Sequence, residues 1–210
     1  MITEWFYNND IDGIRNRVKK IIETNNFKSI DIGAAAYYWS YPECKIIADS
    51  IKINKPDVLQ FEIDIENKNQ YNSIFDYVKN NGIFDFTICS HTLEDVFNPL
   101  DLIELLQKIS KRGFIAIPSK YDEFNYLNGN NFLGNSHHKT IFDVKEDNLF
   151  LFPKYSFIET NKNSEQIRNN YKGKELCIFW ENEIPSYIFG KGIPFRSDGE
   201  LINEYFRQIT

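Results

Sequence analysis

The sequence is poor in the residues that build metal clusters, disulfide frameworks and glycine-rich phosphate loops. Its only cysteines are Cys44, Cys89 and Cys177, far apart in 210 residues and without a CxxC pair. An odd, scattered set argues against a disulfide framework and a cysteine-ligated metal, and it fits a reducing compartment. The 10 glycines include no G-x-G-x-x-G, which disfavours a dinucleotide cofactor such as NAD.

Runs of basic or apolar residues are also missing. The net charge is −6, and no basic run is longer than a pair such as Lys19-Lys20. This balance argues against a nucleic-acid partner held through its phosphates. The first residues, MITEWFYNND, do not resemble a targeting signal, and no apolar run approaches the length of a membrane span. We therefore expect a cytoplasmic protein with no membrane partner.

The first 120 residues alternate helical and strand patterns. One helical face runs through residues 10–24 and another through residues 69–82, which stops at Gly82. Short apolar stretches predict strands at residues 28–32, 45–49, 57–64, 83–90 and 114–119. Between the last two lies NPLDLIELLQKISKRG, where Asn98 and Pro99 are suited to a helix start and Gly113 to its end. Strand, helix and strand in close succession predict a parallel, doubly wound α/β sheet.

The pattern changes after Ser119. Residues 120–148 are polar and rich in Asn and Tyr, which predicts a long loop region of the kind that often carries function. Strands are expected at residues 149–152 and 175–181, where they would complete an antiparallel edge. SDGELINEYFRQI predicts a C-terminal helix, with Ser197 and Glu200 spaced as a capping box. No linker divides the chain, so we expect a single domain over residues 1–210.

A resemblance becomes specific at FDFTICSHTLEDVFNPLDLIELLQKISKRGFIAIPS. The order and spacing of its motifs resemble class I S-adenosylmethionine-dependent methyltransferases, in which an FD strand leads into an SH-LEH turn and then a helix and a further strand. The matching residues are Phe84, Asp85, Ser90, His91, Leu93, Glu94, Asn98, Pro99 and Gly113. The stretch IDIGAAA resembles the first motif of that family, and the match covers about residues 28–120 as the cofactor-binding core.

The resemblance implies S-adenosyl-L-methionine as cofactor, a Rossmann-like sheet with a shortened first crossover, and a set of contacts. The cofactor-binding residues it implies are Asp31, Gly33, Ala34, Ala35, Asp49, Asp64, Ile65, Ser90 and His91. Asp49 would bind the ribose hydroxyls, and a strand-end acid there has little other reason to exist. Two departures are the alanines, Ala34 to Ala36, in place of later glycines, and Asp95 in place of a histidine. Alanine still permits close approach of a ligand where φ stays negative.

The histidines and the loop over residues 120–148 suggest the acceptor side. Methyl transfer to a hydroxyl needs a base, so His137, His138 and His91 are the candidate catalytic residues, with Tyr121, Asp122 and Glu123 as competing candidates. A metal is not expected, because adjacent histidines in extended chain point to opposite faces and no HxxH or HxxxH pair occurs. Tyr37, Tyr38 and Trp39 are expected to pack the shortened crossover.

The acceptor itself depends on the resemblance. Small chains with a histidine pair after the fifth strand are similar to methyltransferases of sugar and cell-surface glycan modification, which implies O-methylation of a small-molecule sugar or glycan precursor. A small metabolite or a protein side chain stays open as the acceptor. Outside catalysis, the alternative is a degenerate methyltransferase fold that only binds a partner. A nicotinamide oxidoreductase is a third alternative.

Overall fold

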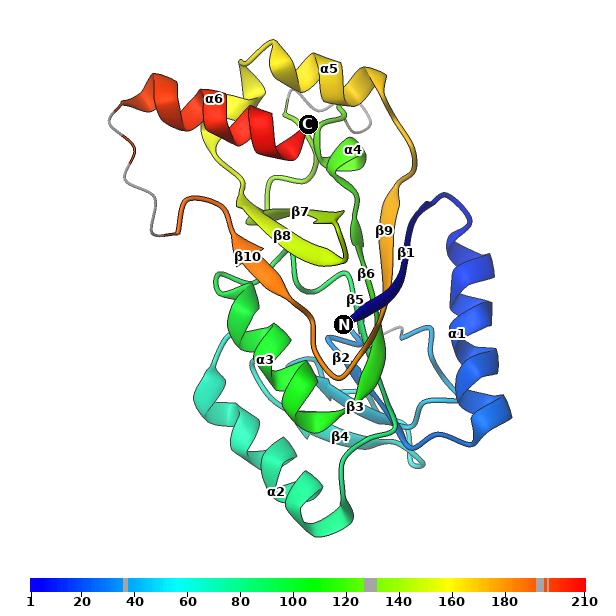
Figure 1. Cartoon of the computed structure of the whole chain (residues 1–210). Helices are drawn as coiled ribbons and strands as arrows, with labels where there is room; N and C mark the ends of the chain where they lie inside the picture. The colour runs from blue at the N-terminus through cyan, green and yellow to red at the C-terminus, as the bar shows by residue number, and fades with distance from the viewer. Residues whose placement is uncertain (36–37, 127–131, 192–194, 196) are drawn as a thin grey trace.

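A seven-stranded sheet forms the centre of the protein (Figure 1). The computed structural model describes residues 1–35, 38–126, 132–191, 195 and 197–210. The strand order is β1-β9-β6-β5-β2-β3-β4, and β9 alone runs against the other strands. The strands span Ile2–Asn8 (β1), Ser29–Ile32 (β2), Ile46–Asp49 (β3), Leu59–Glu62 (β4), Phe86–Ser90 (β5), Arg112–Pro118 (β6) and Glu175–Glu181 (β9).

This arrangement confirms the expected α/β, Rossmann-like class. β2, β3, β4, β5 and β6 pair in parallel, and the order reverses between β2 and β5. The crossover from β2 to β3 contains no helix among its described residues, as the shortened first crossover implied. Residues 50–58, which join β3 to β4, contain no helix either. The carboxyl ends of β2 and β5 therefore lie side by side at the switch point, where open α/β sheets bind ligands.

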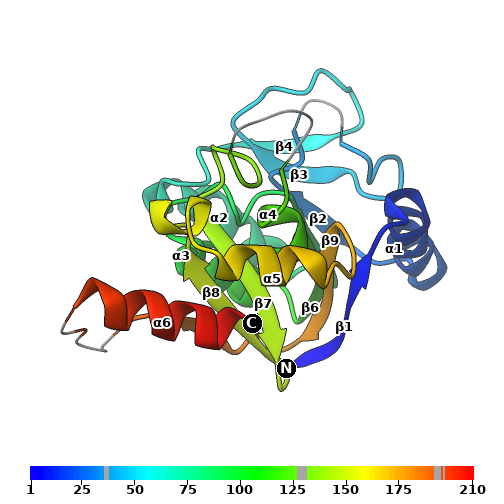
Figure 2. The ribbon, with the colours of Figure 1, turned by 90° about the horizontal axis from the view of Figure 1, so that it is seen from above.

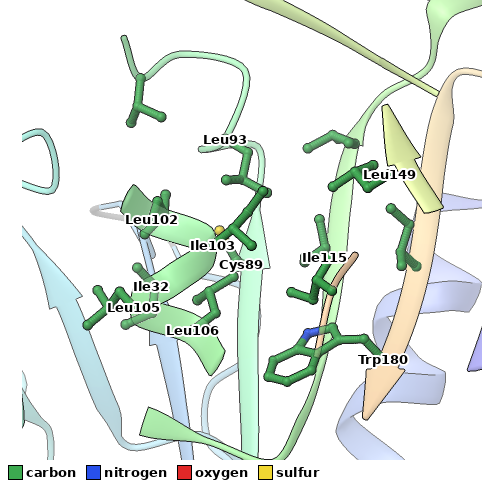
Figure 3. Packing of buried hydrophobic residues seen from close by; sticks show 14 of the residues in the cluster. Ile32, Cys89, Leu93, Leu102, Ile103, Leu105, Leu106, Ile115, Leu149 and Trp180 are labelled. Atoms are coloured by element: carbon green, nitrogen blue, oxygen red, sulfur yellow. The ribbon is translucent and has the colours of Figure 1, made fainter. Parts of the chain in front are cut away.

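Helices cover both faces of the sheet. Successive strand side chains point to opposite faces, and apolar side chains on each face are buried by a helix. α1 (Ile11–Asn25) packs Ile14, Val18 and Ile22 on one face, in a cluster that includes Ile88 of β5. On the other face α3 (Pro99–Ile109) packs in a cluster that includes the next residue, Cys89 (Figure 3). α2 (Asn72–Asn81), preceded by the 3-10 turn η1 (Lys68–Tyr71), joins the face of α3. The two-sided burial explains why residues 83–90 are nearly all apolar.

The first strand was not expected from the sequence. β1 pairs antiparallel with β9, and β9 in turn pairs antiparallel with β6, so the two ends of the chain together complete this edge. The expected strand at residues 175–181 is confirmed as β9. α1 begins at its N-cap Asp10, whose side chain accepts from the backbone of Gly13, and it ends at Asn26 in the left-handed conformation. At α3, Asn98 occupies the N-cap position, but its amide donates to Asp101 instead of capping the backbone.

The interpretation of residues 120–148 as a loop is wrong in part. α4 (Lys120–Glu123) follows β6 directly, and β7 (Thr140–Lys145) forms a hairpin with β8 (Asn148–Pro153). β7, β8 and β10 (Ser186–Ile188) make a second sheet, so the strand expected at 149–152 does not join the edge of the main one. The burial of five of the six β7 residues explains why a strand forms in a segment with polar neighbours.

The second sheet is covered by η2 (Ser156–Glu159), α5 (Asn163–Asn169) and α6 (Asp198–Ile209), which Figure 2 shows from above. The C-terminal helix is confirmed, and the hydroxyl of Ser197 accepts from the backbone of Glu200. Aromatic side chains fill the space between these elements, with Tyr205 and Phe206 of α6 at the centre of the cluster. None of the helices in the described ranges has the length and hydropathy needed to cross a bilayer.

Candidate functional site

A cavity of about 180 Å³ opens at the carboxyl ends of β2 and β5. It lies at the switch point of the sheet, and both strands contribute the residues that follow their last buried positions. The lining residues are Arg15, Asp31, Gly33, Ala34, Ala35, Trp39, Ser90 and His91. Six of these were implied as cofactor contacts, so the structure brings together most of that set.

Gly33 is the residue on which the turn after β2 depends. Its φ is +73°, and a Cβ at this position would lie 2.1 Å from Oγ1 of Thr92. Its backbone N–H donates to Ala48 of β3, at 2.8 Å. Ala35 corrects the expectation for the alanines, because its φ is +55° and not negative. Alanine there is strained, and the strain is held by surrounding contacts.

Asp31 is a buried carboxylate at the wall of this cavity. Its side chain is 1% exposed, and it accepts a 2.7 Å hydrogen bond from Oγ of Ser40. Burial raises the pKa of Asp31 to about 7, and repulsion from Asp49 acts in the same direction. Attraction to Arg15 favours the charged form but does not outweigh burial. Asp31 forms no direct ion pair among the described residues, which suits a site for a cationic group.

Asp49 has a structural role that the sequence did not indicate. Its Oδ2 accepts from the backbone N–H of Ala35 and its Oδ1 from that of Ile51, each at 2.7 Å. These bonds hold the loops after β2 and β3, which gives a strand-end acid a clear reason to exist without a ribose. Asp49 does not line the 180 Å³ cavity among the described residues. Each carboxylate oxygen keeps a further lone pair, so ribose binding stays a prediction.

Asp64 and Ile65 lie beyond β4 and do not reach this cavity among the described residues. The Asp64 carboxylate accepts from the backbone of Glu66, and Ile65 packs against the main core. Tyr38 packs beside Ala34 and Trp39 packs on the α1 face, as expected for the shortened crossover. Ala36 and Tyr37 lie outside the described residues.

A second, more polar cavity of about 330 Å³ adjoins the first through His91. It lies between the turn after β5, the end of β6 and the loop before β7. The lining residues are Ile11, His91, Glu94, Asp95, Pro118, Asp122, Asn135, His137, His138, Lys174 and Glu175. All three histidines of the chain therefore line this one cavity, although His137 and His138 lie 46 and 47 residues after His91 in sequence. A small polar molecule fits such a space.

His91 lies between two buried carboxylates. Its Nε2 is 2.6 Å from Oε1 of Glu175, and its Nδ1 is 3.4 Å from Oε1 of Glu94. Burial alone would lower the pKa of His91, but hydrogen bonds to Glu175 and Glu94 outweigh it and raise the pKa to about 9. His91 is thus a cation at neutral pH. A protonated imidazole has no lone pair to accept a proton, so this state does not favour His91 as the base, and its catalytic role stays a prediction.

His138 is the histidine placed to act as a base. It is buried, and its Nδ1 contacts Oε1 of Glu123, a carboxylate that also accepts from Lys154. Glu123 therefore fixes Nδ1 as the protonated nitrogen and leaves the Nε2 lone pair toward the cavity. Asn135 Nδ2 lies 3.4 Å from that Nε2. Burial opposes protonation of His138, but the bond to Glu123 outweighs it and raises the pKa.

His137 and His138 do not point to opposite faces, as the sequence argument assumed. The chain turns at residues 136–137, so the segment is not extended, and the two rings meet edge to face at 4.5 Å between centroids. Nε2 of His137 lies 3.7 Å from Oδ1 of Asp95, and Nε2 of His138 lies 3.9 Å from the same oxygen. The stated reason for excluding a metal is therefore wrong.

The competing acid-base candidates separate clearly. Tyr121 is buried in the aromatic cluster of the second sheet, and Glu123 is occupied by His138 and Lys154. Asp122 lines the 330 Å³ cavity, and burial raises the pKa of its carboxyl. Among the three, only Asp122 faces the space where an acceptor would bind.

Sequence reasoning missed several lining residues. Glu175 comes from β9, 84 residues after His91, and Arg15 comes from a helix that precedes the sheet. Neither stands in a motif. One signal could have found Glu175: it is a single acid at the start of an apolar strand. Because β9 runs antiparallel to β6, the start of β9 lies beside the carboxyl end of β6, where ligands bind.

Comparison with known proteins gives fold neighbours only. The sequence matches no known family profile and no curated protein. One similar structure is an O-methyltransferase family protein from Burkholderia thailandensis, with a TM-score of 0.45 and 10% identity over 82% of this chain and 56% of that one. This chain thus spans little more than half the length of that protein.

Two further neighbours are covered over most of their length. One is a SAM-dependent methyltransferase and possible histamine N-methyltransferase from Thermotoga maritima, with a TM-score of 0.41 and 12% identity over 81% of this chain and 92% of that one. The other is the plantazolicin methyltransferase BpumL in complex with a substrate analogue and SAH, with a TM-score of 0.43 and 13% identity over 81% and 83% of the two chains. At these identities the likeness concerns the fold alone.

Proposed function

We propose that this protein is an S-adenosylmethionine-dependent methyltransferase that O-methylates a sugar or glycan precursor. The observation that carries the proposal is the pair of adjoining cavities that share His91 as a wall. One lies at the switch point of the sheet, and the other gathers the chain's histidines and several carboxylates. Two reactants bound in adjoining spaces meet at a common boundary, which is what transfer of a group between them requires.

The first cavity suits a cationic cofactor. Asp31 supplies a buried carboxylate without a direct ion pair in the described part of the chain, and S-adenosylmethionine carries a sulfonium and an ammonium group. Gly33 places no side chain beside the cavity, and Ser90 offers a hydroxyl at the carboxyl end of the neighbouring strand β5. The cofactor, when bound, supplies an electrophilic methyl carbon. Asp31, Gly33 and Ser90 would hold it in the first cavity, which His91 separates from the second.

The second cavity suits a hydroxyl acceptor. Transfer of the cofactor's methyl group to a hydroxyl oxygen releases the hydroxyl proton, and Nε2 of His138 would accept this proton. Glu123 holds the His138 ring in the orientation that exposes Nε2 and stabilises the positive charge that results. The cationic His91, fixed by Glu94 and Glu175, would place a positive charge at the boundary between the two cavities. His137 stands at the more exposed rim.

The sugar is supported by the resemblance of the chain and by the character of the cavity. Asp122, Asn135, Lys174 and the histidines offer donors and acceptors on several sides, as a polyhydroxylated ring requires. A small metabolite or a protein side chain is the second acceptor class. An amine acceptor would also be favoured by the carboxylates, and it would need no strong base.

The test uses labelled S-adenosylmethionine with panels of nucleotide sugars, free sugars and amines. We expect label in a sugar product, with His138→Ala at least about a hundredfold slower, the usual effect of removing a general base. Glu123→Gln keeps the size of the side chain and should lower kcat with little change in KM. Asp76→Asn, on the exposed surface of α2, is the matched control and should transfer at the wild-type rate. A His138→Ala protein as fast as the wild type would remove the base.

A binding module without catalysis is the rival class. The specific observation in its favour is the small first cavity, because small-molecule sites commonly measure about 300–1,000 Å³. The hydrogen bonds that Asp49 accepts from the backbone of Ala35 and Ile51 also favour this rival, because they give Asp49 a structural role without a cofactor. Retained cofactor binding without transfer to any acceptor in the panels would support this rival. Titration with NAD tests the third alternative, a nicotinamide oxidoreductase, because such an enzyme must bind that dinucleotide.

A further inference from the structure

Three potential metal ligands meet at the wall of the 330 Å³ cavity. Asp95 follows β5 in the same turn as His91 and Glu94, whereas His137 and His138 come from the turn before β7. One donor atom from each of the three lies within 4.8 Å of the others. Asp95 and His137 are 42 positions apart in sequence, so neither the spacing nor a motif predicts this group of ligands.

The two distances from Asp95 to the histidines suit a single ion. Two donors that each lie about 2.1 Å from one zinc-like ion can be at most about 4.2 Å apart. Oδ1 of Asp95 lies 3.7 Å from Nε2 of His137 and 3.9 Å from Nε2 of His138, so both pairs meet this limit. Both are too long for direct hydrogen bonds, and the space between the three atoms is therefore not closed by contacts among them.

Asp95 and Glu123 supply two independent observations. Oδ1 of Asp95 is inaccessible to solvent and has no hydrogen-bond partner among the described residues, although it is aimed at both imidazoles. Such an oxygen is costly to bury without a partner. Glu123 binds Nδ1 of His138, as carboxylates commonly do for metal-ligating histidines, which leaves Nε2 as the ligand atom with only a long 3.4 Å contact from Asn135 Nδ2. Each observation points to the same position between the three side chains.

We propose that Asp95, His137 and His138 bind one divalent transition-metal ion of the zinc, cobalt or nickel class. Two imidazoles and one carboxylate suit these ions better than Mg²⁺ or Ca²⁺, which prefer oxygen ligands. Three protein ligands at the edge of a cavity leave a position for a further molecule, as in catalytic rather than structural sites.

The ion would add a positive charge to a cavity lined by several carboxylates. If the proposed methyl transfer takes place there, His138 would be a ligand instead of the base, and the ion would acidify the acceptor hydroxyl so that its proton passes to solvent water. Metal binding itself does not depend on the proposed function, because the three ligands are all from this chain.

The test is titration of the metal-free full chain with Co²⁺, without cofactor or acceptor, followed by visible absorption. We expect d–d bands that saturate at one ion per chain and disappear on addition of Zn²⁺. Asp95→Ala and His137→Ala should each weaken Co²⁺ binding at least tenfold. Both side chains are partly exposed, so folding can be checked by circular dichroism without loss of the test.

The matched control is Asp122→Asn, a carboxylate of the same cavity outside the ligand set, which should bind Co²⁺ within about twofold of the wild type. Absence of d–d bands at millimolar Co²⁺ in the folded wild type would overturn the proposal. Equal affinity in wild type, Asp95→Ala and His137→Ala would overturn it as well, since the ion would then lie elsewhere. Failure of methyl transfer leaves these readouts unaffected.

Discussion

Replacing Asp31 by Asn should stabilise the protein without its cofactor and weaken cofactor binding at the same time. The carboxylate is fully buried, and burial raises its pKa to about 7 from an ordinary value of 3.8. Asn has nearly the same shape, and its carbonyl oxygen can still accept from Ser40, so the packing is retained. What changes is the cost of keeping an uncompensated charge in the interior.

The magnitude follows from the pKa difference. Between 3.8 and about 7 there are about 3 units, and at about 1.4 kcal/mol per unit the charged carboxylate costs up to about 4 kcal/mol. Half of that ceiling, about 2 kcal/mol, raises Tm by roughly 4–8 °C for a domain of this size.

The raised pKa of Asp31 also determines how the stability difference varies with pH. A folded pKa above the unfolded value means that the folded state binds the proton more tightly, so wild-type stability falls as pH rises from about 4 to about 7. Above pH 7 both states are ionised and the whole cost is present. The advantage of Asp31→Asn should therefore be absent near pH 4, grow up to pH 7 and stay constant above it.

The assay is thermal unfolding from pH 4 to pH 9, followed by circular dichroism, together with calorimetric titration of S-adenosylmethionine at pH 8. Asp76→Asn, an exposed carboxylate of α2, is the control and should follow the wild type at every pH. The reasoning is refuted if Asp31→Asn melts at or below the wild-type temperature at pH 8. A stability difference that does not vary with pH would refute it too, because the difference would not come from ionisation.

Three other changes follow from the described contacts. Gly33→Ala should lower stability by about 1–3 kcal/mol and abolish cofactor binding, measured by denaturant unfolding and calorimetry, because the new Cβ meets Thr92 and φ is +73°. His91 should titrate near pH 9 by NMR, and its contribution to stability, complete below pH 6.5, should disappear as pH rises through 9. Lys120→Ala should cost about 3–5 kcal/mol in urea unfolding, because it leaves the buried Asp143 carboxylate without its 2.8 Å ion pair.

The parallel half of the fold could be read from local sequence patterns. Continuous apolar stretches such as residues 83–90 indicate strands covered on both faces. The helix of residues 99–109 begins at the expected Pro99, whereas Gly113, the expected stop, lies in β6. β1 carries no comparable signal, because its partner β9 lies more than 160 residues away and pairing between distant strands leaves no local pattern. β7 pairs locally with β8, but its apolar residues lie at the end of a segment that is polar over most of its length, which concealed the strand.

The site was predictable where it depends on strand ends. Ser90 and His91 follow from the rule that ligands bind at the carboxyl ends of parallel strands, and Asp31 and Gly33 were implied by the family resemblance; the structure places all four around one cavity. Their chemical states were not predictable. His91 is cationic because Glu175 arrives from a distant strand, and no reading of the SH motif reveals that partner.

The convergence of His137 and His138 on Asp95 depends on a turn that the sequence pattern did not indicate. An extended segment would have separated the rings, whereas the turn brings both toward one oxygen. Side-chain direction in a loop is set by tertiary contacts, here Glu123 and Lys154, and it cannot be derived from the order of residues alone.

The central claim is that the cavity at the ends of β2 and β5 binds S-adenosylmethionine. Calorimetric titration of the purified chain with this compound at pH 8 tests the claim most directly. The account predicts one molecule bound per chain, with micromolar affinity in the wild type and at least tenfold weaker binding in Asp31→Asn. No heat of binding at millimolar cofactor, from protein shown to be folded by circular dichroism, would contradict it.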